Sequence, residues 1–161
     1  MNNVLIRPVE ATDNASLAKI IRSAFFDFGA PTKGTVFEDP TTDDLFGLFA
    51  GAGAVLWVAA TPETLLGCCG IYPTKGLPEG YVEVVKFYLS ATARGRGIGR
   101  LLLAKSLESA AALHYRGVYL ESLPQFDTAV GMYERLGFKR LEHPLGCSGH
   151  TGCTIWMAKE L

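Results

Sequence analysis

A strand, a glycine-rich loop and a helix follow one another between residues 81 and 114 of this 161-residue chain. The strand run reads Tyr-Val-Glu-Val-Val-Lys-Phe-Tyr-Leu over 81–89, and a helical run follows from about 97. The loop between them reads Arg-Gly-Arg-Gly-Ile-Gly-Arg over 94–100. Glycines let the backbone adopt positive φ close to a ligand. The first amides of a helix lack intrahelical partners, and arginines suit phosphate oxygens. The segment therefore predicts a phosphate-binding site at a helix N-terminus.

Two common nucleotide-binding motifs do not fit this loop. A dinucleotide fingerprint that starts at Gly95 would need glycine where Arg100 stands. A Walker A reading that starts at Gly99 fails because Ala104 replaces a required glycine and three leucines occupy the loop. An unrelated nucleotide-binding domain is therefore disfavoured.

The remaining pattern, R-x-x-G-x-G at 94–99, has a companion further along the chain. Residues 129–138 read A-x-x-x-Y-E-x-x-G-F, at the offset from the loop that is usual in one family. Together these segments resemble the GNAT superfamily of N-acetyltransferases. The resemblance is strong over 81–138 and weaker but continuous outside it.

This resemblance implies a mixed α/β fold: a central, mostly antiparallel sheet flanked by helices, with the fourth and fifth strands splayed apart. It also implies acetyl-CoA as cosubstrate and direct transfer to a primary amine of a small molecule or peptide. An asparagine that often contacts pantetheine is replaced here by Phe126, so Ser122 or Gln125 would take its place. The residues expected to bind the cosubstrate are Phe87, Tyr88, Leu89, Arg94, Gly95, Arg96, Gly97, Ile98, Gly99, Arg100 and Ser122.

Acetyl transfer to an amine needs a base, a donor to the carbonyl oxygen and a proton for the thiolate. By resemblance, Tyr133 is the acid near the sulfur, and a phenol with a pKa of about 10 is protonated at neutral pH. Glu83 and Glu121 are both candidate bases, because burial can raise a carboxyl pKa. Two other options stay open: His150, or no protein base. A non-catalytic acyl-CoA-binding or regulatory module is the alternative function, which loss of both acid and base would favour.

The acceptor site is expected in the first two helices and nearby loops, where aromatic and acidic residues are dense. Aromatic faces and carboxylates together suit an ammonium group, although core packing and helix capping explain most of these residues equally well. The residues concerned are Phe25, Phe26, Phe28, Phe37, Phe46 and Phe49, with Asp27, Glu38, Asp39, Asp43 and Asp44.

Bulk properties limit the remaining function classes. The length fits one domain over 1–161. A net charge of −1 argues against a general nucleic-acid partner. We expect no membrane-spanning segment. The protein is expected to be cytoplasmic, with its cysteines as free thiols. A homodimer is one option for the oligomeric state. Cys147, His150 and Cys153 are too few and wrongly spaced for zinc, so no metal is expected.

The hydrophobic periodicity and the turn residues predict the order of elements along the chain. Inward-facing positions of the third helix are predicted to be Leu103, Leu107, Ala110 and Ala111. Strands are expected at 4–7, 55–60, 65–72, 81–89, 118–121, 139–142 and 154–159. Helices are expected at about 14–25, 97–114 and 127–136, with a tight glycine-rich turn at 143–152. A further short helix is expected to be capped by the Thr-Thr-Asp-Asp run at 41–44 and to end at about Phe49.

Overall fold

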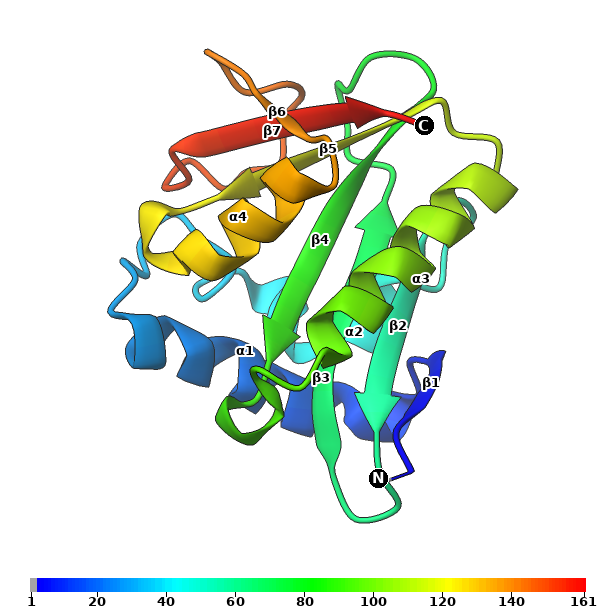
Figure 1. Cartoon of the computed structure of the whole chain (residues 1–161), viewed down its shortest axis with the longest axis vertical. Coiled ribbons are helices and arrows are strands. Elements are labelled where there is room, and N and C mark those ends of the chain that lie inside the picture. The colour runs from blue at the N-terminus through cyan, green and yellow to red at the C-terminus, as the bar shows by residue number, and fades with distance from the viewer. Residues whose placement is uncertain (1–2) are drawn as a thin grey trace.

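The computed structural model describes residues 3–161 and contains a seven-stranded mixed sheet with the order β1-β2-β3-β4-β5-β7-β6 (Figure 1). The strands are β1 (Leu5–Pro8), β2 (Val55–Ala60), β3 (Leu65–Tyr72), β4 (Tyr81–Leu89), β5 (Gly117–Ser122), β6 (Lys139–Arg140) and β7 (Ile155–Glu160). The predicted mixed α/β fold is therefore confirmed, with strand positions within about two residues of those expected from alternation and turn residues.

The one parallel contact of this sheet joins β4 to β5, and it is short. Only Tyr81, Val82 and Glu83 have partners on β5. Beyond Glu83 the two strands diverge, and Figure 1 shows β4 running away from β5 at a wide angle. The predicted splay is thus present, and it leaves one edge of β4 without a strand partner, so its polar groups are available to a ligand.

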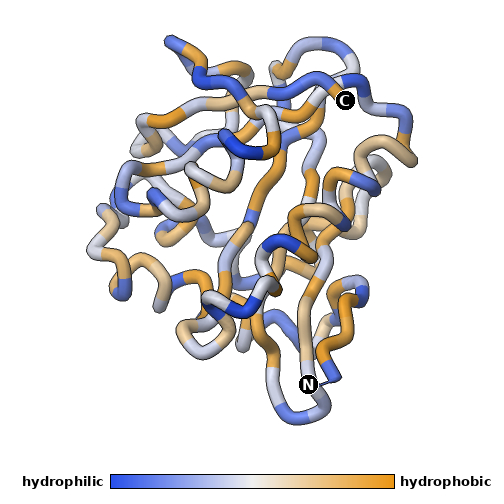
Figure 2. Tube along the Cα trace, viewed as in Figure 1, coloured by the Kyte–Doolittle hydropathy of each residue, from blue (hydrophilic) through white to orange (hydrophobic). Residues whose placement is uncertain are grey.

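Helices cover both faces of the sheet. On one face lie α3 (Ile98–Ala112) and α4 (Asp127–Arg135), and on the other lie α1 (Asn14–Phe28) and the short α2 (Leu45–Leu48) (Figure 1). Each face has its own apolar core, one around Leu102 and Leu103 of α3 and one around Ile21 and Phe25 of α1. In Figure 2 the central strands contain many apolar residues, whereas the loop between β4 and α3 contains polar ones.

The helix α1 forms because its apolar residues recur at helical spacing. Leu17, Ile21 and Phe25 are buried almost completely, and burial of each such side chain stabilises the fold by about 1.5–3 kcal/mol. The helix ends at Gly29, whose φ of 63° is the left-handed conformation that favours glycine at this position.

Two helical predictions need correction, whereas the short helix predicted to be capped within 41–44 is present as α2, and Asp44 caps it. A 3-10 turn (Pro40–Asp43), capped by Asp39, precedes it. The helix α3 begins at Ile98 and ends at Ala112, inside the predicted bounds. Its residue Ala111 is exposed rather than buried.

The C-terminal segment also differs from the prediction. The strand β6 is only two residues long, and residues 143–154 form a long loop instead of a tight turn between the last strands. This loop crosses to distant segments: the Cys147 amide donates to the Lys75 carbonyl at 2.8 Å, and the Gly152 amide donates to the Gly34 carbonyl at 2.7 Å. These backbone bonds therefore hold the loop against the β3–β4 loop at Lys75 and against the segment after α1 at Gly34.

Within residues 3–161 no helix is long and apolar enough to cross a membrane. Cys68 and Cys69 are free and buried, while Cys147 and Cys153 are free and at least partly exposed.

Candidate active site

The splay between β4 and β5 opens into a cavity of about 510 Å³. Its walls come from α1, β4, the loop before α3, the end of β5, the start of α4 and the loop 143–154. A large, mostly apolar cavity with a few convergent polar groups is the usual form of a small-molecule site. The residues discussed below are placed relative to this cavity.

The glycine-rich loop forms one wall of the cavity. Gly95 and Gly97 have φ of 73° and 79°, and Gly97 is the N-cap of α3. A Cβ added at either position would meet no heavy atom within 4 Å. The backbone is therefore bare at the point where the unpaired amides of the α3 N-terminus face outward, which fits a pyrophosphate.

Arg94 occupies this loop in a different way from the sequence prediction. Its guanidinium forms an ion pair with Asp27 of α1 at 3.0 Å, donates to the Leu89 carbonyl at 3.0 Å and lies over the Phe28 ring. Arg94 thus ties α1 to the end of β4 and lines the cavity as part of the protein framework.

The predicted cosubstrate residues divide into two groups. Two of them lie outside the cavity wall: Ile98 is buried in the core below α3, and Arg96 is exposed. Gln125, the alternative to Ser122, is exposed as well. The residues that line the cavity are Phe87, Tyr88, Leu89, Arg94, Gly95, Gly97, Gly99, Arg100 and Ser122.

Tyr133 comes from α4 and lines the same cavity. Its ring packs against Phe87 and Phe138 at centroid distances of 6.0 and 5.6 Å, and only 6% of the residue is exposed. Burial raises the pKa of its phenol well above the ordinary value, so the hydroxyl keeps its proton. The position and the protonation state both suit a proton donor.

Glu83 is the last residue of β4 that pairs with β5, and it is 3% exposed. Burial raises its pKa to about 7, against the hydrogen bond that the Thr74 hydroxyl donates at 2.6 Å; the neighbouring Glu121 raises it and Lys86 lowers it. A carboxyl group that lines a cavity and titrates near neutrality can accept a proton there.

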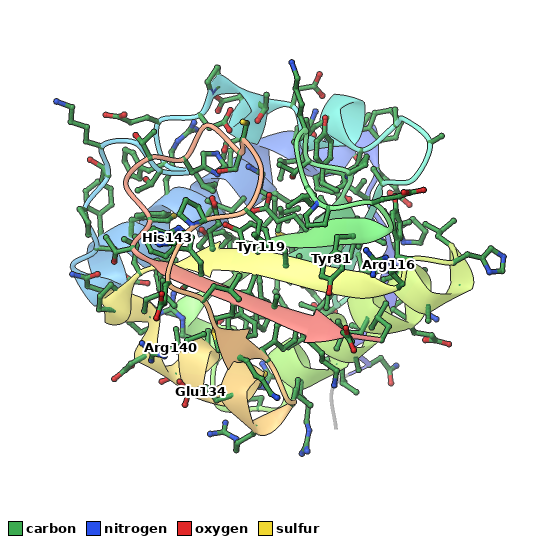
Figure 3. All side chains as sticks on the ribbon, turned by 90° about the horizontal axis from the view of Figure 1, so that it is seen from above. Tyr81, Arg116, Tyr119, Glu134, Arg140 and His143 are labelled. Carbon is green, nitrogen blue, oxygen red and sulfur yellow. The ribbon has the colours of Figure 1, made fainter. Side chains whose placement is uncertain are left out.

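Glu121 lies on β5 and also lines the cavity, but its oxygens are occupied. Oε1 accepts from the Ser148 hydroxyl at 2.5 Å, and Oε2 accepts from the Tyr119 hydroxyl at 2.7 Å. Tyr119 also accepts a bond from the Leu145 amide, and Figure 3 shows its side chain reaching towards the loop that follows His143. Glu121 therefore holds the loop 143–154 on the end of β5.

His150 stands at the inner side of that loop and lines the cavity. Its Nε2 lies 2.8 Å from Oδ2 of Asp39. Burial opposes ionisation of Asp39, but hydrogen bonds from Thr41 and His150 outweigh it and lower its pKa to about 2. This pair joins residues 111 positions apart, so no local sequence pattern predicts it.

The predicted aromatic and acidic acceptor region is only partly at the cavity. Phe25 and Phe28 line it, whereas Phe26 and Phe46 are exposed on the surface. Most carboxylates there have structural partners. These are Asp27 with Arg94, Asp43 with Arg22, Asp44 with the Gly47 amide and Glu38 with the Gly34 amide.

Two cavity residues, Phe126 and Lys86, have positions that the sequence did not predict. Phe126 lies in the wall and packs edge-on against Phe25 and Phe28 at 5.4 and 5.6 Å. Lys86 is 5% exposed and also lines the cavity. The sequence feature that could have indicated Lys86 is its charge within a mostly apolar strand, three positions after Glu83.

Metal ligands do not gather in this region. Across residues 3–161 no group of three or more His, Cys, Asp or Glu side chains is placed to hold an ion. Cys153 lines the cavity, and burial raises the pKa of its thiol to about 12.

The comparisons with known proteins agree with this geometry. The family model described as the acetyltransferase (GNAT) family matches residues 16–138. An uncharacterized N-acetyltransferase of Escherichia coli, YjgM, is 30% identical over the full length of both chains.

Solved structures share the fold at low sequence identity. A GNAT-family acetyltransferase from Staphylococcus aureus has a TM-score of 0.85 at 18% identity, with 98% of this chain and 99% of that chain covered. A phosphinothricin acetyltransferase from Sinorhizobium meliloti, solved with AcCoA, has a TM-score of 0.77 at 22% identity, with 98% and 88% covered. With its splayed strands, its bare glycine loop and the family match over most of its length, the chain belongs to the GNAT family of acetyltransferases.

Proposed function

We propose that this protein transfers an acetyl group from acetyl-CoA directly to a primary amine of a small molecule or peptide. The observation that carries the proposal is that one cavity brings together a carboxyl group that titrates near pH 7, a protonated phenol and the bare loop at the α3 N-terminus. These are the base, the acid and the phosphate cradle that the reaction requires.

Acetyl-CoA supplies an acetyl group already activated as a thioester. The amides of the loop 95–100 and the N-terminus of α3 hold its pyrophosphate, and Arg100 adds a positive charge. The unpaired edge of β4 after Glu83 offers amides to the pantetheine and the acetyl carbonyl. Phe87, Tyr88 and Leu89 therefore contribute mainly through their backbone.

Glu83 accepts one proton from the ammonium form of the acceptor, directly or through one water, and this leaves a neutral amine. The nitrogen then forms a bond to the acetyl carbon while the carbon–sulfur bond breaks. Tyr133 gives its proton to the departing sulfur, the second proton that the acetylated nitrogen loses restores the phenol, and Glu83 releases its own proton to solvent. Glu121 positions the loop 143–154 in this scheme and takes no part in proton transfer, because both of its oxygens accept hydrogen bonds from the protein.

A panel of primary amines with acetyl-CoA, followed by CoA release, tests the proposal. We expect release to depend on both the amine and Tyr133, and the product to carry the acetyl group on nitrogen by mass spectrometry. Tight acetyl-CoA binding without amine-dependent release across amino acids, polyamines, aminoglycosides and peptides would instead support a non-catalytic acyl-CoA-binding module.

A further inference from the structure

Lys86 sits at an irregularity in β4 that changes the direction of its side chain. The pairing of β4 with β3 shifts between Cys68 and Gly70, and Lys86 has a φ of 56° at the extra residue. Residues three positions apart, which point to opposite faces in a regular strand, point to the same face across this irregularity. Val84 and Phe87 both face the α3 layer, and Val85 and Tyr88 both face the α1 layer. Bulges often re-aim a side chain beside a functional site, and positive φ in a non-glycine residue is strained.

Lys86 lines the cavity on the side of Glu83 and of His150, the partner of Asp39, and this side is called the acceptor end. Lys86 acts electrostatically on Asp39 and Glu83, and these residues come from the loop before α2 and from the inner end of β4. Burial lowers the pKa of its ammonium, and Asp39, Cys68 and Glu83 partly offset that effect. The glycine loop for the cosubstrate lies at the other end of β4.

The Lys86 side chain is mostly buried, but its ammonium nitrogen opens into the cavity, and no described residue pairs with it. The ammonium group has three donors, yet within residues 3–161 neither a side-chain hydrogen bond nor an ion pair reaches it. Lysines are almost never this buried unless they are paired. The nearby carboxylates have donors of their own: Asp39 has Thr41 and His150, Glu83 has Thr74, and Glu121 has Ser148 and Tyr119.

From this arrangement we infer that Lys86 binds an anionic group of the acceptor, and that the acceptor is a small amine with a carboxylate, of the amino-acid class. The inference rests on the proposed function, since it assigns a substrate class to the same cavity. A carboxylate of the acceptor would accept a charge-assisted hydrogen bond from the Lys86 ammonium, whose donors have no partner in the protein.

The spacing of Glu83 and Lys86 restricts the acceptor further. Glu83 is the residue that receives the amine proton, and it is close enough to Lys86 for each to affect the pKa of the other. The amine and the anion must therefore lie on one molecule with few atoms between them. A polyamine has no anion, and a lysine side chain of a protein carries none near its amine. The rings of Phe28 and Phe126 leave an apolar wall for the remainder of the acceptor.

Matched pairs of amines test the inference. Each amino acid of a panel is compared with its own carboxamide, which keeps the amine and the side chain but removes the negative charge. In the wild-type protein we expect kcat/KM for the best amino acid to exceed that for its amide by at least about tenfold. In Lys86→Gln this ratio should fall to about one, mostly through KM, while the affinity for acetyl-CoA is unchanged.

Lys139→Gln is the matched control, because Lys139 is exposed on β6 outside the cavity and the same charge is removed. This variant should keep the wild-type ratio. Equal use of amino acids and amides by the wild type, or a preserved preference in folded Lys86→Gln, would overturn the inference. Loss of acetyl-CoA affinity in Lys86→Gln would also overturn it, because Lys86 would then serve the cosubstrate.

A binding measurement separates this inference from the proposed activity. Calorimetry on the CoA-saturated protein compares the N-acetyl derivatives of glycine, methionine and phenylalanine with their carboxamides. We expect the carboxylates to bind more tightly, and only when Lys86 is present, even if no turnover is seen. If both forms bind equally, or neither binds, the assignment of Lys86 fails whatever the amine panel shows. Absence of turnover with a preserved carboxylate preference would contradict only the proposed transfer.

Discussion

Glu83 and Glu121 lie on neighbouring strands at the same end of the cavity, yet only Glu83 is buried with a single hydrogen-bond donor. Glu83 has the Thr74 hydroxyl, whereas Glu121 has donors on both oxygens. Burial raises the pKa of Glu83 to about 7, and the charge of Glu121 raises it as well. We therefore propose different roles for two carboxylates that the sequence alone leaves equivalent, with Glu83 as the base and Glu121 as an anchor of the loop 143–154.

The first prediction concerns the pH dependence of the reaction. If Glu83 is the base, kcat/KM should rise with pH as Glu83 loses its proton around pH 7. Burial raises this pKa most, the Thr74 hydrogen bond lowers it, and among the neighbouring charges Glu121 raises it and Lys86 lowers it. Glu83→Gln should remove the acidic limb together with most of the activity. Glu121→Gln should keep a limb, moved to lower pH because a neighbouring negative charge has gone. Profiles that stay unchanged in both variants would mean that the amine loses its proton to bulk water.

The raised pKa of Glu83 also predicts how folding stability depends on pH. The folded state binds this proton more tightly than the unfolded chain, whose carboxyl has an ordinary pKa near 4.5. The favourable contribution is therefore complete below about pH 4.5 and is lost as the pH rises through about 7. The Glu83→Gln variant has no ionisable carboxyl group at this position, so its folding stability does not fall for this reason as the pH rises.

Chemical denaturation at several pH values measures this effect. The stability of Glu83→Gln relative to wild type should increase by about 3 kcal/mol between about pH 4 and about pH 8. Such a gain at the cost of activity is common for strained catalytic groups. A difference that stays constant over this range would show that Glu83 is not buried as a neutral acid.

Tyr133 is predicted to act in the chemical step rather than in binding. Tyr133→Phe removes one hydroxyl and should lower kcat by roughly 10²–10⁴, the range for a positioned acid, with acetyl-CoA affinity nearly unchanged. Tyr115→Phe is a suitable control, because it also removes one hydroxyl, which donates to the Gly53 carbonyl at 3.0 Å, but Tyr115 lies outside the cavity. Equal losses of kcat in the two variants would point to general destabilisation instead.

The sequence predicts those parts of the site that depend on local patterns. Alternation in β4 and the glycines at 95 and 97 give the strand, the loop and the helix N-terminus in order, because each depends on neighbouring residues. The resemblance adds the splay beyond Glu83, which depends on how β4 and β5 pair between residues 36 positions apart. These features account for the cosubstrate side of the cavity.

The acceptor side depends on contacts that no local pattern encodes. The direction of Lys86 follows from a register shift against β3, so simple alternation places it wrongly. His150 meets Asp39 only because the loop 143–154 crosses the end of the sheet. Glu121 is a candidate base from the sequence, and its bonds to Ser148 and Tyr119, which tie it to this loop, are visible only in the structure.

The last prediction separates ligand contact from backbone conformation at the glycine loop. Gly97 and Gly29 are both helix-cap glycines with positive φ, 79° and 63°, and an added Cβ meets nothing within 4 Å at either position. Substitution by alanine should therefore lower the free energy of unfolding by a similar amount at the two positions, about 1–2 kcal/mol. Only Gly97 lines the cavity.

Gly97→Ala should thus lose acetyl-CoA affinity strongly, since its methyl group occupies space that the pyrophosphate needs next to the α3 amides. Gly29→Ala should bind acetyl-CoA as the wild type does. Calorimetry with acetyl-CoA, run beside thermal denaturation of both variants, makes the comparison at matched stability. An unchanged affinity in folded Gly97→Ala would move the phosphate site away from the α3 N-terminus. Equal affinity losses in both variants would attribute the effect to backbone strain rather than to contact with the ligand.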